Sequence, residues 1–223
     1  MKIILTGTTG FIGTEVLTQC LRNADITSIV VLSRRPLPNA LSADPKIQVI
    51  LMKDFKIYPD EVVKQLEGAD ACIWSMGTTD AIPELEIDYP LAFARAFSPT
   101  LVGHRRKFRY LHTSGVLAEK DQIKSLLFLQ EGRRIKGMAE NEMIAFAKDE
   151  VHEGGWETYI VRPAMVLHVE GDMLKRIGGY LLGTVKVNEL AAVMIDVVRN
   201  GNEEQILQNA EIVAKGKYLV NAQ

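Results

Sequence analysis

The sequence is poor in the residues that mark several large classes of protein. It has only two cysteines, Cys20 and Cys72, which are too far apart for a disulfide framework or a metal cluster. Each lies in an apolar pattern, which is typical of buried thiols in a reducing compartment. No apolar run is long enough to cross a bilayer. We therefore predict a cytoplasmic chain that holds no metal ion and has no membrane span.

An excess of charge of either sign is also lacking. The formal net charge is −2, because 26 lysine and arginine residues nearly balance 28 aspartate and glutamate residues. Such a chain has no general attraction to nucleic acid, so we predict a small-molecule substrate and no nucleic-acid partner. With 223 residues, 47% of them hydrophobic, the chain can bury a full globular core. A homodimer is left open.

Apolar strand patterns alternate with helical patterns along the chain. This alternation predicts βαβ units with right-handed crossovers in a parallel sheet. Strands are expected at 2–6, 28–32, 47–51, 69–77, 108–113 and 158–163, with a short last strand at 209–213. Helices are expected at 14–23, 59–66, 91–101, 126–147, 172–182 and 188–199, with a loop at 81–90.

The first expected strand runs into three glycines, Gly7, Gly10 and Gly13. Glycine lacks a Cβ atom, so the chain can turn sharply there and its backbone can approach a ligand closely. A helix that begins near Gly10 would point unpaired N–H groups and a partial positive charge at the same space, where a pyrophosphate fits. A tight turn without a ligand is the alternative. The residues predicted to bind the pyrophosphate are Gly7, Thr9, Gly10, Phe11, Ile12 and Gly13.

Further motifs follow this turn. Ser114 comes after the fifth strand, Lys136-Gly137-x-Ala139-Glu140 lies in the long helix, and Val161-Arg162-Pro163 ends the sixth strand. In this order the sequence resembles the atypical short-chain dehydrogenases/reductases, namely compact NAD(P)-binding proteins related to nucleoside-diphosphate-sugar epimerases and to the TIP30 type. The resemblance covers nearly the whole chain. It implies an α/β, Rossmann-type, doubly wound and mostly parallel sheet with helices on both faces, but no particular substrate.

The domain organisation follows from the same resemblance and from the lack of linkers. We expect a single NAD(P)-binding domain over residues 1–223. Segments at about 165–185 and 205–223 are expected to form a small C-terminal portion that covers the substrate. The first of them is rich in apolar residues such as Met173 and Tyr180, which is consistent with a lid or pocket wall and equally with the core face of a helix.

The end of the second strand indicates which dinucleotide is bound. NAD-preferring sites place an acidic residue about 20 positions after the glycines to bind the ribose hydroxyls. Here Ser33, Arg34 and Arg35 stand at that place instead. A guanidinium group matches the geometry of a phosphate, so we predict a pocket for the 2′-phosphate and a preference for NADP(H) over NAD(H). A basic surface turn is the alternative.

The resemblance implies further cofactor contacts by position in the chain. Asp54 and Phe55 follow the third strand, where related proteins hold the adenine. The small residues after the fourth strand are expected beside the nicotinamide ribose. The residues after the sixth strand are expected at the nicotinamide end. These two groups are Ser75, Met76 and Gly77, and Pro163, Ala164 and Val166.

The tyrosine that carries the reaction in classical members of the family is missing. In those members a Tyr-x-x-x-Lys pair lies on one helix face, and the lysine binds the ribose and lowers the pKa of the tyrosine. Lys136 matches the lysine, but Gly132 stands four residues earlier. A glycine there would enlarge the cavity. Lys136 is therefore expected in both a cofactor-binding and a catalytic role.

Three other residues are candidates for the missing proton donor: Ser114, His112 and Tyr89. Residues 112 and 114 of one strand face the same side, so a cofactor-facing Ser114 would bring His112 with it. An imidazole can exchange protons near neutral pH. A hydrogen-bonded core histidine and a packing tyrosine are the alternatives for His112 and Tyr89.

Three functions follow from these residues. In the first, the protein is an NADP(H)-dependent oxidoreductase that acts on a small carbonyl or alcohol substrate with a non-standard proton donor. In the second, it catalyses a non-redox isomerisation or cyclisation in the same pocket. In the third, it senses NADP(H) or binds a partner without turnover.

Overall fold

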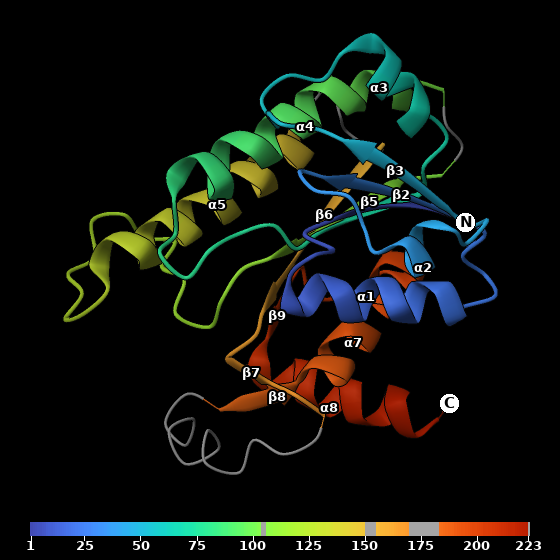
Figure 1. Cartoon of the computed structure of the whole chain (residues 1–223). Coiled ribbons are helices and arrows are strands. Elements are labelled where there is room, and N and C mark those ends of the chain that lie inside the picture. Colours follow the sequence, from blue (N-terminus) through green and yellow to red (C-terminus); the bar gives the residue numbers. More distant parts are fainter. Residues whose placement is uncertain (104–105, 150–154, 170–182, 223) are drawn as a thin grey trace.

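The computed structural model describes residues 1–103, 106–149, 155–169 and 183–222 (Figure 1). Seven parallel strands form one sheet in the order β3-β2-β1-β4-β5-β6-β9. The order reverses beside the first strand, which is where ligands bind in open α/β sheets. The strands are β1 (Lys2–Thr6), β2 (Ser28–Ser33), β3 (Ile47–Leu51), β4 (Ala71–Trp74), β5 (Phe108–Thr113), β6 (Trp156–Arg162) and β9 (Ile206–Gln208).

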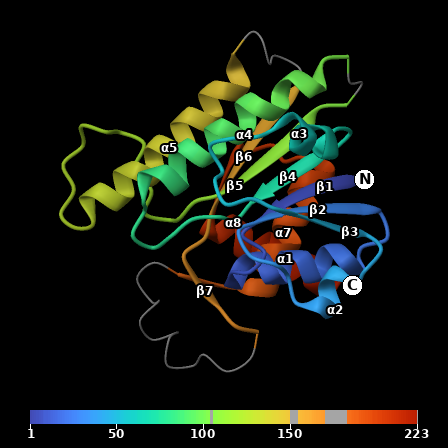
Figure 2. The same cartoon turned by 45° about the horizontal axis from the view of Figure 1, so that its top comes forward.

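Helices cover both faces of the sheet (Figures 1 and 2). One face carries α1 (Phe11–Arg22), α7 (Val187–Asn200) and α8 (Asn209–Asn221). The other face carries α3 (Asp60–Leu66), α4 (Tyr89–Phe97) and α5 (Gln130–Lys148). The shorter elements are α2 (Asn39–Ser42), a π-helical turn η1 (Glu84–Asp88), a 3₁₀ turn η2 (Ser98–Leu101), and the two-stranded parallel pair β7 (Met165–Leu167) and β8 (Thr184–Lys186).

The central strands β1, β2 and β4 are buried on both sides, which explains why they are nearly continuous apolar runs. Successive side chains of β1 point to opposite faces. Ile3 and Leu5 pack with α1 and α7 in an aliphatic core, whereas Ile4 packs on the opposite side of the sheet. That second core is rich in aromatic residues, among them Trp74 and Phe93. The predicted α/β fold with a mostly parallel sheet is confirmed.

Two predicted element assignments are wrong. The loop expected at 81–90 instead contains the start of the helical segment η1–α4. Pro83 stands at the N-cap position of η1. Pro90 lies in the first turn of α4, where the missing backbone N–H of a proline is tolerated. The strand expected at 209–213 is the first turn of α8, and the actual strand β9 lies just before it. A short apolar run does not distinguish a strand from a helix.

Other boundaries differ by a few residues or lie outside the described part. The fourth strand ends at Trp74, so the following small residues form a loop rather than the end of the strand. The helix expected at 172–182 falls outside the described residues. Of the segment 205–223, the described part adds β9 to the sheet and α8 to the helical layer; its role as a substrate cover stays a prediction.

Candidate functional site

The glycine turn between β1 and α1 depends on the absence of side chains. Gly7 has φ +70°, and a Cβ atom there would lie 2.3 Å from the carbonyl oxygen of Ser75. A Cβ atom at Gly13 would lie 2.2 Å from the carbonyl oxygen of Gly7. The two glycines therefore let the turn pack against the loop after β4 and let α1 pack against the turn. This brings the N-terminus of α1 to the carboxyl edge of the sheet.

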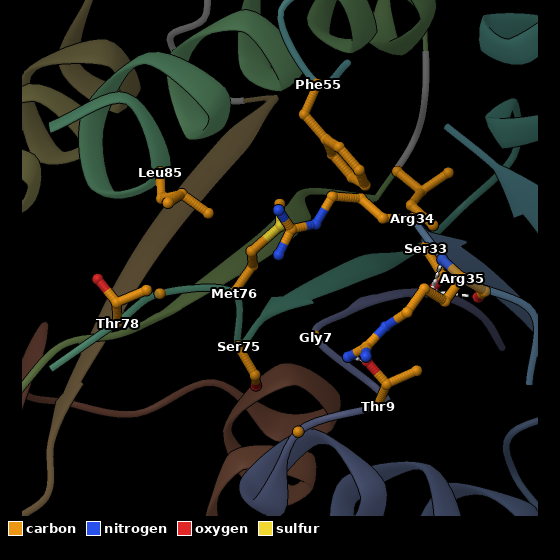
Figure 3. Close-up of a pocket in the computed structure, with 13 residues that line it drawn as sticks. Gly7, Thr9, Ser33, Arg34, Arg35, Phe55, Ser75, Met76, Thr78 and Leu85 are labelled. Carbon is orange, nitrogen blue, oxygen red and sulfur yellow. Dashed lines mark hydrogen bonds between the residues drawn. The ribbon is translucent and has the colours of Figure 1, made fainter. Parts of the chain in front are cut away.

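A cavity of about 170 Å³ opens beside this turn (Figure 3). It lies across the carboxyl ends of β1, β2 and β4, at the reversal of strand order. Most of the residues expected to bind the cofactor line it: Gly7, Thr9, Gly10, Ser33, Arg34, Arg35, Phe55, Ser75, Met76 and Gly77. Sequence reasoning did not single out three further lining residues, Leu32, Thr78 and Leu85.

The two arginines after β2 differ in their directions. Arg34 extends across the cavity toward Met76, and Arg35 turns to the glycine turn, where its Nη2 donates to Thr9 Oγ1 at 3.3 Å (Figure 3). Ser33 stabilises the turn of residues 33–35 after β2, because its hydroxyl donates to the carbonyl oxygen of Arg35 at 2.7 Å. None of the described residues that line the cavity is acidic. The cavity wall is therefore strongly cationic at the end of β2.

Several predicted cofactor contacts do not line this cavity. Phe11 packs its ring on His168, with centroids 4.3 Å apart, and Ile12 packs into the aliphatic core. Asp54 is exposed and accepts the backbone N–H of Lys56 at 2.8 Å, which closes a tight turn. The residues after β6 lie elsewhere. Pro163 is buried, the Ala164 N–H donates to Asn209 Oδ1 at 2.8 Å, and Val166 packs on the aliphatic core.

Lys136 is held by a glutamate that no sequence motif pointed to. Its Nζ lies 3.1 Å from Oε1 of Glu86, a fully buried side chain in η1. The same oxygen accepts the backbone N–H of Thr78 at 2.8 Å. Close by, a Cβ atom on Gly132 would lie 3.5 Å from the Cβ of Ala81, so a loop side chain already contacts the position of the expected tyrosine. The space predicted there is therefore partly taken up.

Ser114 belongs to a buried polar cluster behind this region. Its hydroxyl donates to Glu140 Oε1 at 2.6 Å. Arg162 donates to both oxygens of the same carboxylate, from Nε at 2.8 Å and from Nη2 at 2.5 Å. The motif Lys136-Gly137-x-Ala139-Glu140 and the motif Val161-Arg162-Pro163 therefore meet through Glu140 and Arg162. The Ser114 hydroxyl proton is engaged in this cluster.

His112 and Tyr89 lie inside the aromatic side of the molecule. His112 is buried, its Nδ1 lies 3.1 Å from the Tyr110 hydroxyl, and burial together with the charge of Lys136 lowers its pKa to about 3. It is therefore neutral at ordinary pH. Tyr89 is buried at the start of α4 rather than in a loop, and its ring stacks on Phe55 with centroids 5.6 Å apart. Their catalytic roles stay predictions.

Two classes of site are absent from the described ranges. No three His, Cys, Asp or Glu side chains come together there in a way that could hold a metal ion. No helix within those ranges is both long and apolar enough to span a membrane.

Comparison with known proteins supports the fold. No protein-family model matches the sequence. The "Leucinostatins biosynthesis cluster protein T" of Purpureocillium lilacinum is 35% identical over 120 residues, which cover 51% of this chain and 42% of that protein. The chain thus matches less than half the length of this relative.

Solved structures match over far more of the chain. The PhqB reductase domain from Penicillium fellutanum has a TM-score of 0.67 at 20% identity and covers 93% of this chain and 66% of its own. Gre2 from Candida albicans in complex with NADPH has a TM-score of 0.69 at 18% identity, over 93% and 77%. A short-chain dehydrogenase/reductase from Burkholderia thailandensis has a TM-score of 0.65 at 14% identity, over 94% and 92%.

These likenesses define the class of fold. The chain has the Rossmann-type fold that NAD(P)-dependent reductases of the short-chain dehydrogenase/reductase type share. The expected resemblance is confirmed at this level.

Proposed function

We propose that this protein binds NADP(H) and acts as an oxidoreductase on a small carbonyl or alcohol substrate. The carrying observation is the wall of the cavity after β2, where Arg34 and Arg35 replace the acidic residue of NAD-preferring sites. Two guanidinium groups, the N-terminus of α1 and the Thr9 hydroxyl form a donor set suited to the phosphates of a dinucleotide. The NADPH complex of Gre2, which has the same fold, is consistent with this cofactor.

The residues of the cavity divide between the two ends of the cofactor. Gly7, Gly10 and the start of α1 would hold the pyrophosphate, and Arg34 and Arg35 the 2′-phosphate. Phe55 and Met76 would face the adenine side. Lys136 does not line this cavity but pairs with Glu86 behind its wall, and it would bind the nicotinamide ribose. NADPH, when bound, supplies the hydride for a carbonyl carbon.

Lys136 is the group best suited to supply the accompanying proton. Its side chain is 21% accessible, so the ammonium would regain a proton from solvent more readily than a fully buried group. The three candidates predicted from the sequence are less suitable. The Ser114 hydroxyl is engaged by Glu140, His112 is buried, and Tyr89 stacks on Phe55. The engagement or burial of these three side chains also favours a second candidate function, an NADP(H)-binding module without turnover.

Calorimetric titration of NADPH and NADH tests the cofactor. NADPH is expected to bind more tightly, and Arg34→Ala is expected to weaken NADPH binding about tenfold, because a charged hydrogen bond is lost, while NADH binding stays unchanged. Arg95→Ala, which removes an exposed arginine from α4, is the matched control. An unchanged NADPH-to-NADH ratio in Arg34→Ala would contradict the phosphate pocket.

A panel of aldehydes and ketones then tests the reaction. Consumption of NADPH by any member of the panel, followed optically, is expected for an oxidoreductase. Tight binding of NADPH without turnover of any member favours the non-catalytic module.

A further inference from the structure

Glu86 is a buried carboxylate that the proposed reaction does not use directly. It is fully buried in η1, so it cannot contact a ligand in the cavity. Its Oε1 accepts from the Thr78 backbone and from Lys136, whereas no described residue donates to its buried Oε2. Carboxylates are rarely buried without full pairing, so this half-paired group needs an explanation.

Glu140 provides a comparison within the same region. It is equally buried, but both of its oxygens accept hydrogen bonds, from Ser114 and from the two donors of Arg162. Glu140 is therefore satisfied within the fold. Glu86 is not, and its one cationic partner within the described ranges is the lysine that we assign to the nicotinamide ribose.

Glu86 lies directly behind the wall of the cavity. A Cβ atom on Gly77, which lines the cavity, would lie 2.9 Å from Oε1 of Glu86. The same oxygen thus contacts the Gly77–Thr78 part of the wall and the ammonium of Lys136, which places the ammonium next to this part of the wall. An ammonium group has three N–H donors, and the contact with Glu86 uses one of them.

We propose that Glu86 is a positioning residue that holds the Lys136 ammonium at the cavity wall, with its remaining donors directed to the nicotinamide ribose. Gly132 leaves Lys136 without the tyrosine neighbour of the classical arrangement, and Glu86 provides a fixed partner from the opposite element. A lysine side chain is otherwise free to adopt many rotamers. A fixed partner therefore reduces the side-chain conformational entropy that is lost when the ribose binds. The identity of the ligand rests on the proposed function.

A double-mutant cycle on NADPH binding tests this role. The variants are Glu86→Gln, which keeps the shape of the side chain but removes its charge, Lys136→Met, and the two together. We expect NADPH affinity to fall about fivefold in Glu86→Gln and about tenfold in Lys136→Met. The double variant is expected to bind no more weakly than Lys136→Met, because Glu86 acts through Lys136.

Two further variants separate positioning from folding. Glu86→Asp keeps the charge on a shorter side chain and is expected to bind NADPH better than Glu86→Gln. Glu189→Gln removes the charge of a second buried glutamate, in the first turn of α7, and is expected to bind NADPH like the wild type. Thermal melting of each variant reports whether it is folded at the temperature of the titration.

The outcomes are distinct. Losses that add in the double variant, or a Glu86→Gln variant that binds NADPH like the wild type, overturn the positioning role while the proposed function stands. Absence of NADPH binding by the wild type overturns both.

Discussion

The glycine turn and the region around Lys136 are built by different means. At the turn the backbone sets the geometry, through Gly7 at φ +70° and the close contact of Gly13 with the turn. Around Lys136 pairs of side chains from distant segments set it, such as Glu86 with Lys136 and Glu140 with Arg162. The geometry of a backbone turn is determined by a few adjacent residues, whereas a pair of distant side chains is brought together only by the whole fold. The glycine turn therefore has the motif that the sequence predicts, whereas Gly132 stands in place of the expected tyrosine near Lys136.

The largest effect is expected from adding a side chain at the first glycine of the turn. Gly7→Ala is expected to lower the free energy of unfolding by about 4 kcal/mol, because it adds a left-handed alanine and a clash with the Ser75 carbonyl. NADPH binding should be lost with it. Urea denaturation and calorimetry measure the two effects.

Gly68→Ala is the matched control for this variant. Gly68 has φ +73°, but a Cβ atom there meets nothing within 4 Å. Gly68→Ala should lower the free energy of unfolding by about 1 kcal/mol, from the backbone conformation alone, and leave NADPH binding unchanged. Equal costs for the two variants would mean that the contact with Ser75 does not matter.

The second prediction compares two glycines of α5, Gly132 and Gly137, which are five residues apart. A Cβ atom at Gly137 would lie 1.7 Å from the carbonyl oxygen of Glu119, so Gly137→Ala should cost about 3 kcal/mol. A Cβ atom at Gly132 would make only an ordinary contact with Ala81, at 3.5 Å. Gly132→Ala should therefore stabilise the protein by about 1 kcal/mol, the helix propensity of alanine over glycine.

Urea denaturation of both variants checks this pair. A destabilised Gly132→Ala would show that the space beside the expected tyrosine position is tighter than the contact with Ala81 indicates. A neutral Gly137→Ala would show that the loop of Glu119 moves freely away from α5.

The third prediction concerns the protonation of His112, on the aromatic side of the molecule. The pKa of His112 is about 3 in the fold, against 6.5 for an unperturbed imidazole. The unfolded chain therefore takes up the proton first, so stability is lost as the pH falls below 6.5. Between about pH 7 and pH 5 the free energy of unfolding should fall by about 2 kcal/mol through this group.

His112→Asn removes the titration while keeping a hydrogen-bonding side chain. Its unfolding free energy, measured by urea denaturation across the same range, should fall about 2 kcal/mol less than that of the wild type. Parallel pH dependences would show that the fold does not lower the pKa of His112.

Much of the fold follows from the sequence for a physical reason. Strands buried on two faces are nearly continuous apolar runs, so β1 and β2 are predicted within one residue. The bounds of β3 and β5 are predicted equally well, from β-branched and aromatic residues between turns. Short runs beside prolines carry less information. The start of α4 was taken for a loop because of Pro83 and Pro90, although proline is well tolerated in a first helical turn.

The candidate site divides in the same way. The glycines, Arg34 and Arg35 were found because each is tied to a turn or a strand end that periodicity locates. Glu86 was not found, because its partner Lys136 is 50 residues away and only the packing of η1 against α5 brings them together. Glu140 stood inside a recognised motif, but nothing in the sequence connected it with Ser114 and Arg162.

The aromatic layer beneath the cavity allows ligand binding to be followed by tryptophan fluorescence. The chain has two tryptophans, and both lie in this layer, with Trp74 fully buried at the end of β4, immediately before the cavity residues Ser75 and Met76. If NADPH binds in this cavity as proposed, an indole so near to it can transfer its excitation to the reduced nicotinamide. Intrinsic emission of the unlabelled protein therefore offers an optical signal of occupancy, and Trp74→Phe identifies which of the two indoles reports it.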